Sequence, residues 1–130
     1  MSWNKIKIDA ADRMFSNYIR LKADWKCENC GKLCLVNGEW VARLEASHYW
    51  SRSHEGTRFD EENVHSLCNT CHRGMGGHTR TETGEYDVWM MKKLGKKKFE
   101  MLRVRANTYY KKDRALALLW STALYNGLKN

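Results

Sequence analysis

Two Cys-x-x-Cys pairs constrain this chain more than any other feature. Cys27 and Cys30 form the first pair, and Cys68 and Cys71 form the second. Each pair places two thiolates on one tight turn, and two such turns offer four sulfurs to one tetrahedral ion, for which zinc is the usual choice. Four thiolates leave no open coordination position, so this ion would stabilise the fold without doing chemistry. We therefore predict a structural Zn²⁺ site at these cysteines.

The remaining composition agrees with a small intracellular protein. With 130 residues, the chain has room for one hydrophobic core. Paired cysteines in a reducing compartment indicate metal binding rather than disulfides, and no βαβ pattern supports the alternative of a redox Cys-x-x-Cys. The fifth cysteine, Cys34, is expected to be a small buried hydrophobe. Residues 1–10 lack an apolar run, so we expect a cytoplasmic protein without a membrane anchor.

Periodicity divides the chain into three stretches of a single α+β domain. Apolar residues three or four apart predict a helix over residues 9–23, with Asp9 as its N-cap. Alternation over residues 40–45 predicts a short strand. Further helices are expected at 86–94, 96–105 and 113–128. The expected parts are an N-terminal helix in 1–25, a zinc-containing core in 26–82 and a basic helical extension in 83–130.

The positive charge of the chain is concentrated in the third stretch. Between Lys92 and Arg114 there are ten basic and two acidic residues, which accounts for the whole net charge of +8. Such a run is often a solvated helix face, but its position beside metal-ligand motifs favours contact with DNA phosphates. The DNA-binding residues predicted from this stretch are Lys96, Lys97 and Lys98.

Histidine and asparagine side chains lie close to the cysteine pairs. His48 and Asn63 fall between the pairs, and His72 directly follows Cys71. An ion joining the pairs would draw these residues together. Phosphodiester hydrolysis needs a neutral imidazole to deprotonate water, a divalent ion to stabilise developing charge and a polar group to orient the imidazole. We therefore expect His48, Asn63 and His72 to form a catalytic site.

These residues resemble the HNH endonucleases of the ββα-metal type that carry a zinc knuckle pair. Within that group the chain is most similar to the phage NinG (Rap) recombination proteins. The resemblance covers about residues 27–101. It rests on Cys27-x-x-Cys30-Gly31, Ala46-Ser47-His48-Tyr49, Arg58-Phe59-Asp60 with Glu62-Asn63-Val64-His65, and Cys68-x-x-Cys71.

The resemblance implies a role for each matching residue. His48 would be the general base, Asn63 would hold the His48 loop, and His72 would bind a catalytic Mg²⁺ or Mn²⁺. Many HNH sequences have an aspartate directly before the first histidine, whereas this chain has Ser47. The second ligand of the catalytic ion is therefore open between two candidates, Glu45 and His65.

Several arginines near these motifs are candidates for clamping a substrate phosphate, because guanidinium groups bind phosphate through two hydrogen bonds. The candidates are Arg52, Arg58, Arg73 and Arg80. His54 and His78 are expected to be loop residues, and Gly74, Gly76 and Gly77 are expected to end the helix that carries His72.

Taken together, the sequence predicts a metal-dependent DNA endonuclease of the HNH type. The resemblance implies branched or duplex DNA as substrate, in a phage recombination context within the host cytoplasm. The alternative is a zinc-stabilised DNA-binding protein or an adaptor in a phage recombination or packaging complex.

The last helix raises the question of a homodimer. Its apolar stripe would either pack on its own domain, which we expect, or join two copies. The stripe consists of Leu116, Leu119, Trp120, Ala123 and Leu124. The aromatic residues expected in the core are Trp89, Phe99, Trp120 and Tyr125.

Overall fold

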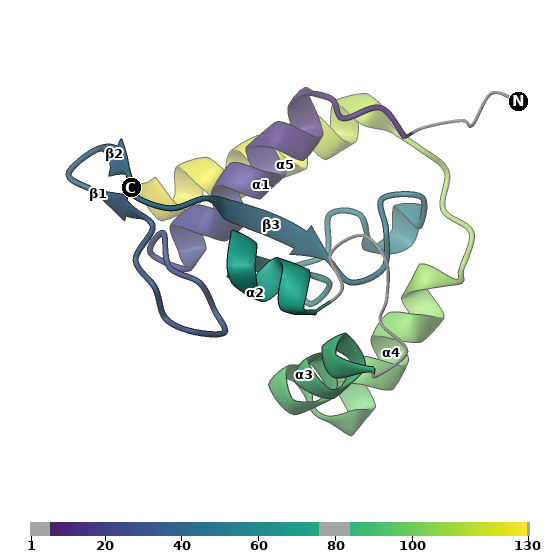
Figure 1. Cartoon of the computed structure of the whole chain (residues 1–130). Helices are drawn as coiled ribbons and strands as arrows, with labels where there is room; N and C mark the ends of the chain where they lie inside the picture. The colour runs from purple at the N-terminus through teal and green to yellow at the C-terminus, as the bar shows by residue number, and fades with distance from the viewer. Residues whose placement is uncertain (1–5, 76–83, 130) are drawn as a thin grey trace, which may run out of the picture.

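The computed structural model of the chain describes residues 6–75 and 84–129. Within these ranges the protein is a mixed α+β structure with two small antiparallel sheets (Figure 1). The elements in chain order are α1 (Ala10–Lys22), β1 (Leu35–Val36), β2 (Glu39–Trp40), β3 (Leu44–His48), the 3₁₀ turn η1 (Glu55–Thr57), β4 (Val64–Cys68), α2 (Asn69–Gly74), α3 (Glu85–Leu94), α4 (Lys96–Ala106) and α5 (Arg114–Lys129).

Helix α1 begins with a reciprocal cap. The Asp12 backbone N–H donates to Asp9 Oδ1 at 3.0 Å, and the Asp9 N–H donates to Asp12 Oδ2 at 2.9 Å. These bonds satisfy two backbone donors that the first turn of a helix leaves free. The helix buries Phe15 and Ile19 on the side facing the sheet. The predicted helix and its Asp9 cap are confirmed.

Strands β3 and β4 form the sheet that the other elements surround. They pair antiparallel, with Glu45 opposite Leu67 and His48 opposite Val64. Because side chains alternate along a strand, Glu45 and Ser47 face one side and His48 faces the other. Helices α1 and α2 both contact β3, and Val64 packs in the cluster that contains the α1 residues (Figure 1). The two faces of β3 thus present side chains to two different environments.

The strand predicted over residues 40–45 is wrong in its bounds. Strand β2 ends at Trp40, and β3 begins only at Leu44. Between them the N–H groups of Val41 and Ala42 both donate to the Cys34 carbonyl, at 2.8 and 3.4 Å. This turn toward the cysteine region interrupts the strand, and the alternation in the sequence did not reveal it.

The three later helices lie where the sequence places them, within one or two residues. Helices α3 and α4 meet at Gly95, whose φ of +85° lies in the region that favours glycine. Helix α2 ends at Gly74. Gly76 and Gly77 lie outside the described residues. None of the described helices is long and apolar enough to cross a membrane.

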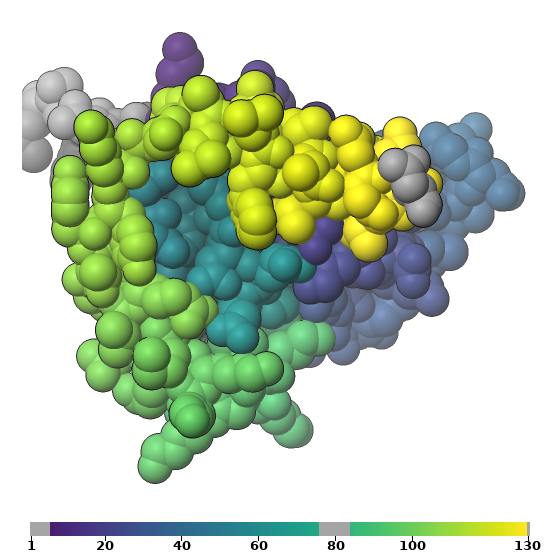
Figure 2. Space-filling model, turned by 180° about the vertical axis from the view of Figure 1, so that it is seen from behind, coloured from purple at the N-terminus to yellow at the C-terminus, as the bar shows by residue number. Residues whose placement is uncertain are grey.

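Helix α5 packs on its own domain mainly through a different face from the predicted apolar stripe. Helix α5 lies against α1 through Ala117 and Ser121, with Leu124 and Tyr125 packing on the cluster around Phe15. Small residues suit this contact because they let two helix backbones approach closely. Leu116, Leu119 and Trp120 instead point outward, and Trp120 is 52% exposed, so its assignment to the core is wrong. Figure 2 shows α5 lying along the outside of the molecule. A contact between two copies through this stripe stays a prediction.

A buried ion pair ties α1 to the loop that follows β3. The Arg58 side chain is 3% exposed and donates to both carboxylate oxygens of Asp12, at 2.8 and 2.5 Å. Burial alone would raise the pKa of Asp12, but the bonds from Arg58 and the Asp9 backbone lower it from 3.8 to about 2. The carboxylate therefore stabilises the fold above pH 3.8, and this contribution is lost as the pH falls toward 2.

Replacing Asp12 tests this pair. Asp12→Asn leaves the buried Arg58 guanidinium with only the longer contact to Glu55, at 3.5 Å, as a countercharge, which costs about 3 kcal/mol of unfolding free energy. Urea unfolding followed by tryptophan fluorescence should show a midpoint lowered by about 1 M or more. The matched control is Asp24→Asn, at an exposed position. Equal midpoints for the two variants would contradict the stabilising role of the pair.

Candidate metal centre and adjoining pocket

The four paired cysteines lie together in the structure. Their sulfur atoms are all within 4.8 Å of one another, and the sulfurs of Cys30 and Cys68 are 3.8 Å apart. A zinc ion bound to four sulfurs at about 2.3 Å would hold them about 3.8 Å apart. Gly31 ends the first turn with a φ of +78°. Cys27, Cys30, Cys68 and Cys71 could therefore hold a metal ion such as zinc.

Hydrogen bonds to sulfur support the same site. Asn29 Nδ2 donates to Cys71 Sγ at 3.2 Å, and the Cys30 backbone N–H donates to Cys27 Sγ at 3.5 Å. Burial raises the pKa of Cys27, but hydrogen bonds from the surrounding backbone N–H groups together outweigh this effect. The net shift of the Cys27 pKa is therefore downward. Burial and the neighbouring sulfurs raise the pKa of Cys71. Four adjacent thiolates therefore need a bound cation to ionise together.

The fifth cysteine takes no part in this cluster. Cys34 is fully buried in the core beside Leu44 and Leu67, and burial raises the pKa of its thiol. The prediction that it acts as a small hydrophobe is confirmed.

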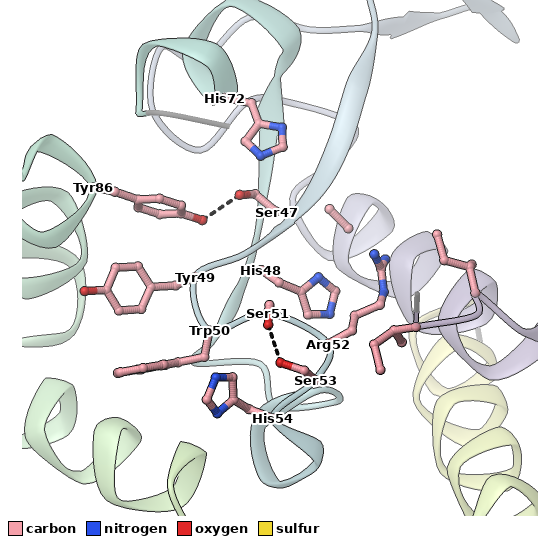
Figure 3. Close-up of a pocket in the computed structure, with 13 residues that line it drawn as sticks. Ser47, His48, Tyr49, Trp50, Ser51, Arg52, Ser53, His54, His72 and Tyr86 are labelled. Carbon is pink, nitrogen blue, oxygen red and sulfur yellow. Dashed lines mark hydrogen bonds between the residues drawn. The ribbon is translucent and has the colours of Figure 1, made fainter. Parts of the chain in front are cut away.

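A pocket of about 530 Å³ lies at the carboxyl end of β3. His48, Arg52 and His72 all line it, together with Ser47 and Tyr86 (Figure 3). The structure thus brings the two predicted catalytic histidines, which are far apart in the sequence, to one cavity. In Figure 3 the His72 ring points toward Ser47, and the His48 ring points toward Arg52.

His72 and Glu45 are direct neighbours. His72 lies on α2, and its Nδ1 contacts Glu45 Oε2 from β3. The other carboxylate oxygen of Glu45 pairs with the exposed side chain of Arg43 at 3.1 Å. Imidazole and carboxylate are both ligands that Mn²⁺ accepts. The pair supplies two protein ligands at most, because the four-cysteine cluster is the only larger group of such side chains among the described residues.

Ser47 and His65 are engaged elsewhere. Ser47 is buried, and its hydroxyl lies 2.6 Å from the Tyr86 hydroxyl on α3. The His65 ring packs edge-on against Trp89 at 5.1 Å and lines a different pocket, which also includes Glu28. Of the two candidate second ligands, the structure brings Glu45 to His72 and leaves His65 in that other pocket.

His48 is held as a neutral imidazole. Burial and the nearby Arg52 guanidinium lower its pKa to about 4, although its hydrogen bond to the Arg58 carbonyl opposes the shift. The bond joins His48 Nε2 to that oxygen at 3.0 Å. Because a carbonyl only accepts, Nε2 carries the proton and Nδ1 keeps its lone pair at pH 7.

Asn63 fastens the loop between His48 and the 3₁₀ turn. Its side chain is fully buried, and its Oδ1 accepts from the Trp50 backbone N–H at 2.8 Å. Its Nδ2 donates to the carbonyls of Trp50 and Thr57, at 2.9 and 3.0 Å. All three bonds end on the backbone of the loop that forms one wall of the pocket.

The predicted phosphate-binding arginines divide into different environments. Arg52 lines the pocket and lies 3.5 Å from the Asp12 carboxylate. Arg73 is exposed on α2. Arg58 is buried against Asp12, so its guanidinium cannot meet DNA in this structure, and the sequence-based role for it is corrected. Arg80 and His78 lie outside the described residues.

Only some of the basic side chains in residues 92–114 are free of ion pairs within the described part of the chain. Lys93 pairs with Glu28 at 3.2 Å, Arg105 pairs with Asp60 and Glu62 at 2.8 Å, and Arg114 pairs with Asp9 at 2.6 Å. Lys98 lies 4.0 Å from Glu62. Lys96 and Lys97 are exposed at the start of α4 and make no ion pair within the described part of the chain.

Two residues that had no predicted role in the site contribute to the pocket. Tyr86 bonds Ser47, and Asp12 holds Arg58, whose carbonyl binds His48. Asp12 lies three residues before Phe15, on the buried side of α1. An acidic residue on an otherwise apolar helix face is the signal that would have predicted a buried ion pair.

Removing one sulfur tests the metal centre. In Cys68→Ser the site loses a ligand that also joins β4 to α2, so we expect loss of bound metal and of cooperative unfolding. Elemental analysis of the purified parent should give one metal ion per chain. Cys34→Ala is the control and should keep the ion. A Cys68→Ser protein that retains both its metal and a cooperative transition would contradict the four-sulfur site.

Comparison with known proteins adds the family. No curated protein and no solved structure matches the chain. The family described as bacteriophage lambda NinG protein matches over residues 3–116, from before α1 to the start of α5. The match covers most of the sequence, and the chain therefore belongs to the bacteriophage lambda NinG protein family.

Proposed function

We propose that this protein is a metal-dependent endonuclease that hydrolyses DNA phosphodiester bonds in the pocket at the end of β3. The observation that carries the proposal is that one pocket combines a neutral His48, the His72–Glu45 pair and Arg52. The order of β3, β4 and α2, with His48 ending the first strand and His72 on the helix, is the arrangement that the HNH resemblance implies.

Two kinds of metal ion have separate roles in this proposal. Zn²⁺ would be held by the four cysteines and would fix the end of β4 against the turn after α1. Mg²⁺ or Mn²⁺ would be held by His72 and Glu45. When bound, this second ion supplies positive charge that stabilises the charge developing on the phosphate and the leaving oxygen.

His48 acts as the general base. Its Nδ1 takes a proton from the attacking water as the water oxygen forms a bond to phosphorus, while Nε2–H stays on the Arg58 carbonyl. The bond from phosphorus to the leaving nucleotide oxygen breaks, and that oxygen takes a proton from solvent. A base with a pKa of about 4 stays unprotonated at neutral pH, and it releases the acquired proton readily to solvent. Arg52 donates to phosphate oxygens. Asn63 holds in place the loop that follows His48 and carries Arg52.

The charge distribution and the family support DNA as the substrate. The net charge of +8 favours a polyanionic partner, and exposed Lys96 and Lys97 extend this preference beyond the pocket. Membership of the NinG family, together with the resemblance to phage recombination proteins, supports branched or duplex DNA that arises during phage recombination.

A second function is favoured by one observation. The position where many HNH sequences have a metal-binding aspartate holds Ser47, whose hydroxyl is bonded to Tyr86. A protein that had lost its catalytic ion would still bind DNA through its basic surface. In that case it would be a zinc-stabilised DNA-binding protein or an adaptor in a recombination or packaging complex.

A nicking assay separates the two functions. Supercoiled plasmid is incubated with the protein without added metal, with Mg²⁺ and with Mn²⁺. We expect nicking only with added metal, and His48→Ala should lower its rate by about a hundredfold or more because the general base is lost. Gel-shift affinity for DNA should not change.

The control is Ser51→Ala, which alters the same pocket without removing a proposed role and should nick at the parental rate. Equal nicking by His48→Ala and the parent would contradict the proposed site. Binding without any nicking would favour the non-catalytic function.

A further inference from the structure

A second pocket, of about 710 Å³, adjoins the first. Ser53 and His54 line both pockets, so the two cavities share one wall. The opposite wall of the second pocket is the connection between α4 and α5, which runs along one edge of the molecule in Figure 1. That connection contains the sequence Tyr109-Tyr110-Lys111-Lys112.

We propose that this second pocket binds one unpaired nucleotide of the DNA substrate, with its base stacked on Tyr109 and its phosphates against Lys111 and Lys112. The inference rests on the proposed function for the identity of the polymer and adds a site for an unpaired nucleotide. Aromatic rings beside lysines are the combination that binds single-stranded nucleic acid.

The connection is a fixed wall. The His54 ring bonds the Ala106 carbonyl through Nδ1 at 2.8 Å. Arg105 before the connection pairs with Asp60, and Arg114 after it pairs with Asp9. Asp113 accepts from the backbone of the first turn of α5. The residues between these anchors are therefore held over the loop that forms the shared wall.

The two tyrosines of the connection differ in their surroundings. Tyr110 packs over Gly56, where a Cβ atom would lie only 2.5 Å from the tyrosine ring. Tyr109 is 88% exposed, more than any other large hydrophobic residue in the described part of the chain. Tyr110 thus anchors the segment, and the ring of Tyr109 is left accessible for a ligand.

The charges of the connection also differ from those of its flanks. Arg105 and Arg114 are neutralised by carboxylates. Lys111 and Lys112 are exposed and form no ion pair among the residues that the structure describes. Positive charge next to an accessible ring suits a nucleotide, which carries an anionic phosphate and a flat base.

The geometry favours an unpaired nucleotide over a paired one. Within a duplex both faces of each base are covered by its neighbours, so stacking on a protein ring requires a base that has left the stack. Because the two pockets share Ser53 and His54, such a base would lie next to the phosphodiester that the first pocket is proposed to cut. The substrate class is therefore DNA with an unpaired nucleotide beside the cleaved bond.

The test measures binding without cleavage. Fluorescence anisotropy, with no divalent ion added, compares a labelled single-stranded oligonucleotide with the same sequence as a duplex. Tyr109→Ala should weaken single-strand binding by about tenfold and leave duplex binding within about twofold. Tyr109→Phe keeps the ring and should bind like the parent. Replacing an exposed side chain should not affect folding, and urea unfolding checks this point.

Three outcomes would overturn the inference: unchanged single-strand affinity in Tyr109→Ala, an equal loss on duplex, or an equal loss in Tyr109→Phe. The two proposals fail separately, because this assay requires no hydrolysis. Metal-dependent nicking, together with unchanged single-strand affinity in Tyr109→Ala, would overturn only the nucleotide site. Tyr109-dependent binding with no nicking would overturn only the endonuclease.

Discussion

The convergence of four sulfurs on one point is the constraint on which the rest of the structure depends. Cys27 and Cys30 follow α1, Cys68 ends β4, and Cys71 lies on α2, so one ion bound between them would join three elements. The position of α2 follows from this junction. Because His72 is the next residue after Cys71, the same junction sets the His72 ring against β3 and Glu45.

The other side of the pocket depends on a different interaction. The buried pair between Asp12 and Arg58 holds the loop after β3 against α1, and the Arg58 carbonyl fixes the tautomer of His48. Asn63 adds three bonds to the backbone of the same loop. The metal centre positions His72 and the ion pair positions the loop after His48, and the proposed chemistry requires both histidines to line the pocket at the carboxyl end of β3.

Much of this arrangement follows from the sequence. Spacing alone predicted the helices, the Asp9 cap and the two cysteine pairs, because each of these features depends on residues close together in the chain. That the two pairs meet was predicted from the four ligands that one tetrahedral ion needs. The turn at Val41 and the outward direction of Trp120 could not be predicted, since they depend on which surfaces α1 and the cysteine turns present to them. Likewise Arg58 looks like a DNA contact in sequence, and only its buried partner Asp12 shows otherwise.

Anomalous scattering from crystals soaked in Mn²⁺, recorded on both sides of the manganese edge, tests the central claim most directly. The account predicts one ion among the four sulfurs and a manganese ion bound by His72 and Glu45 in the pocket that His48 lines. Manganese at His65, or no manganese in that pocket when the sulfur site is full, would contradict it.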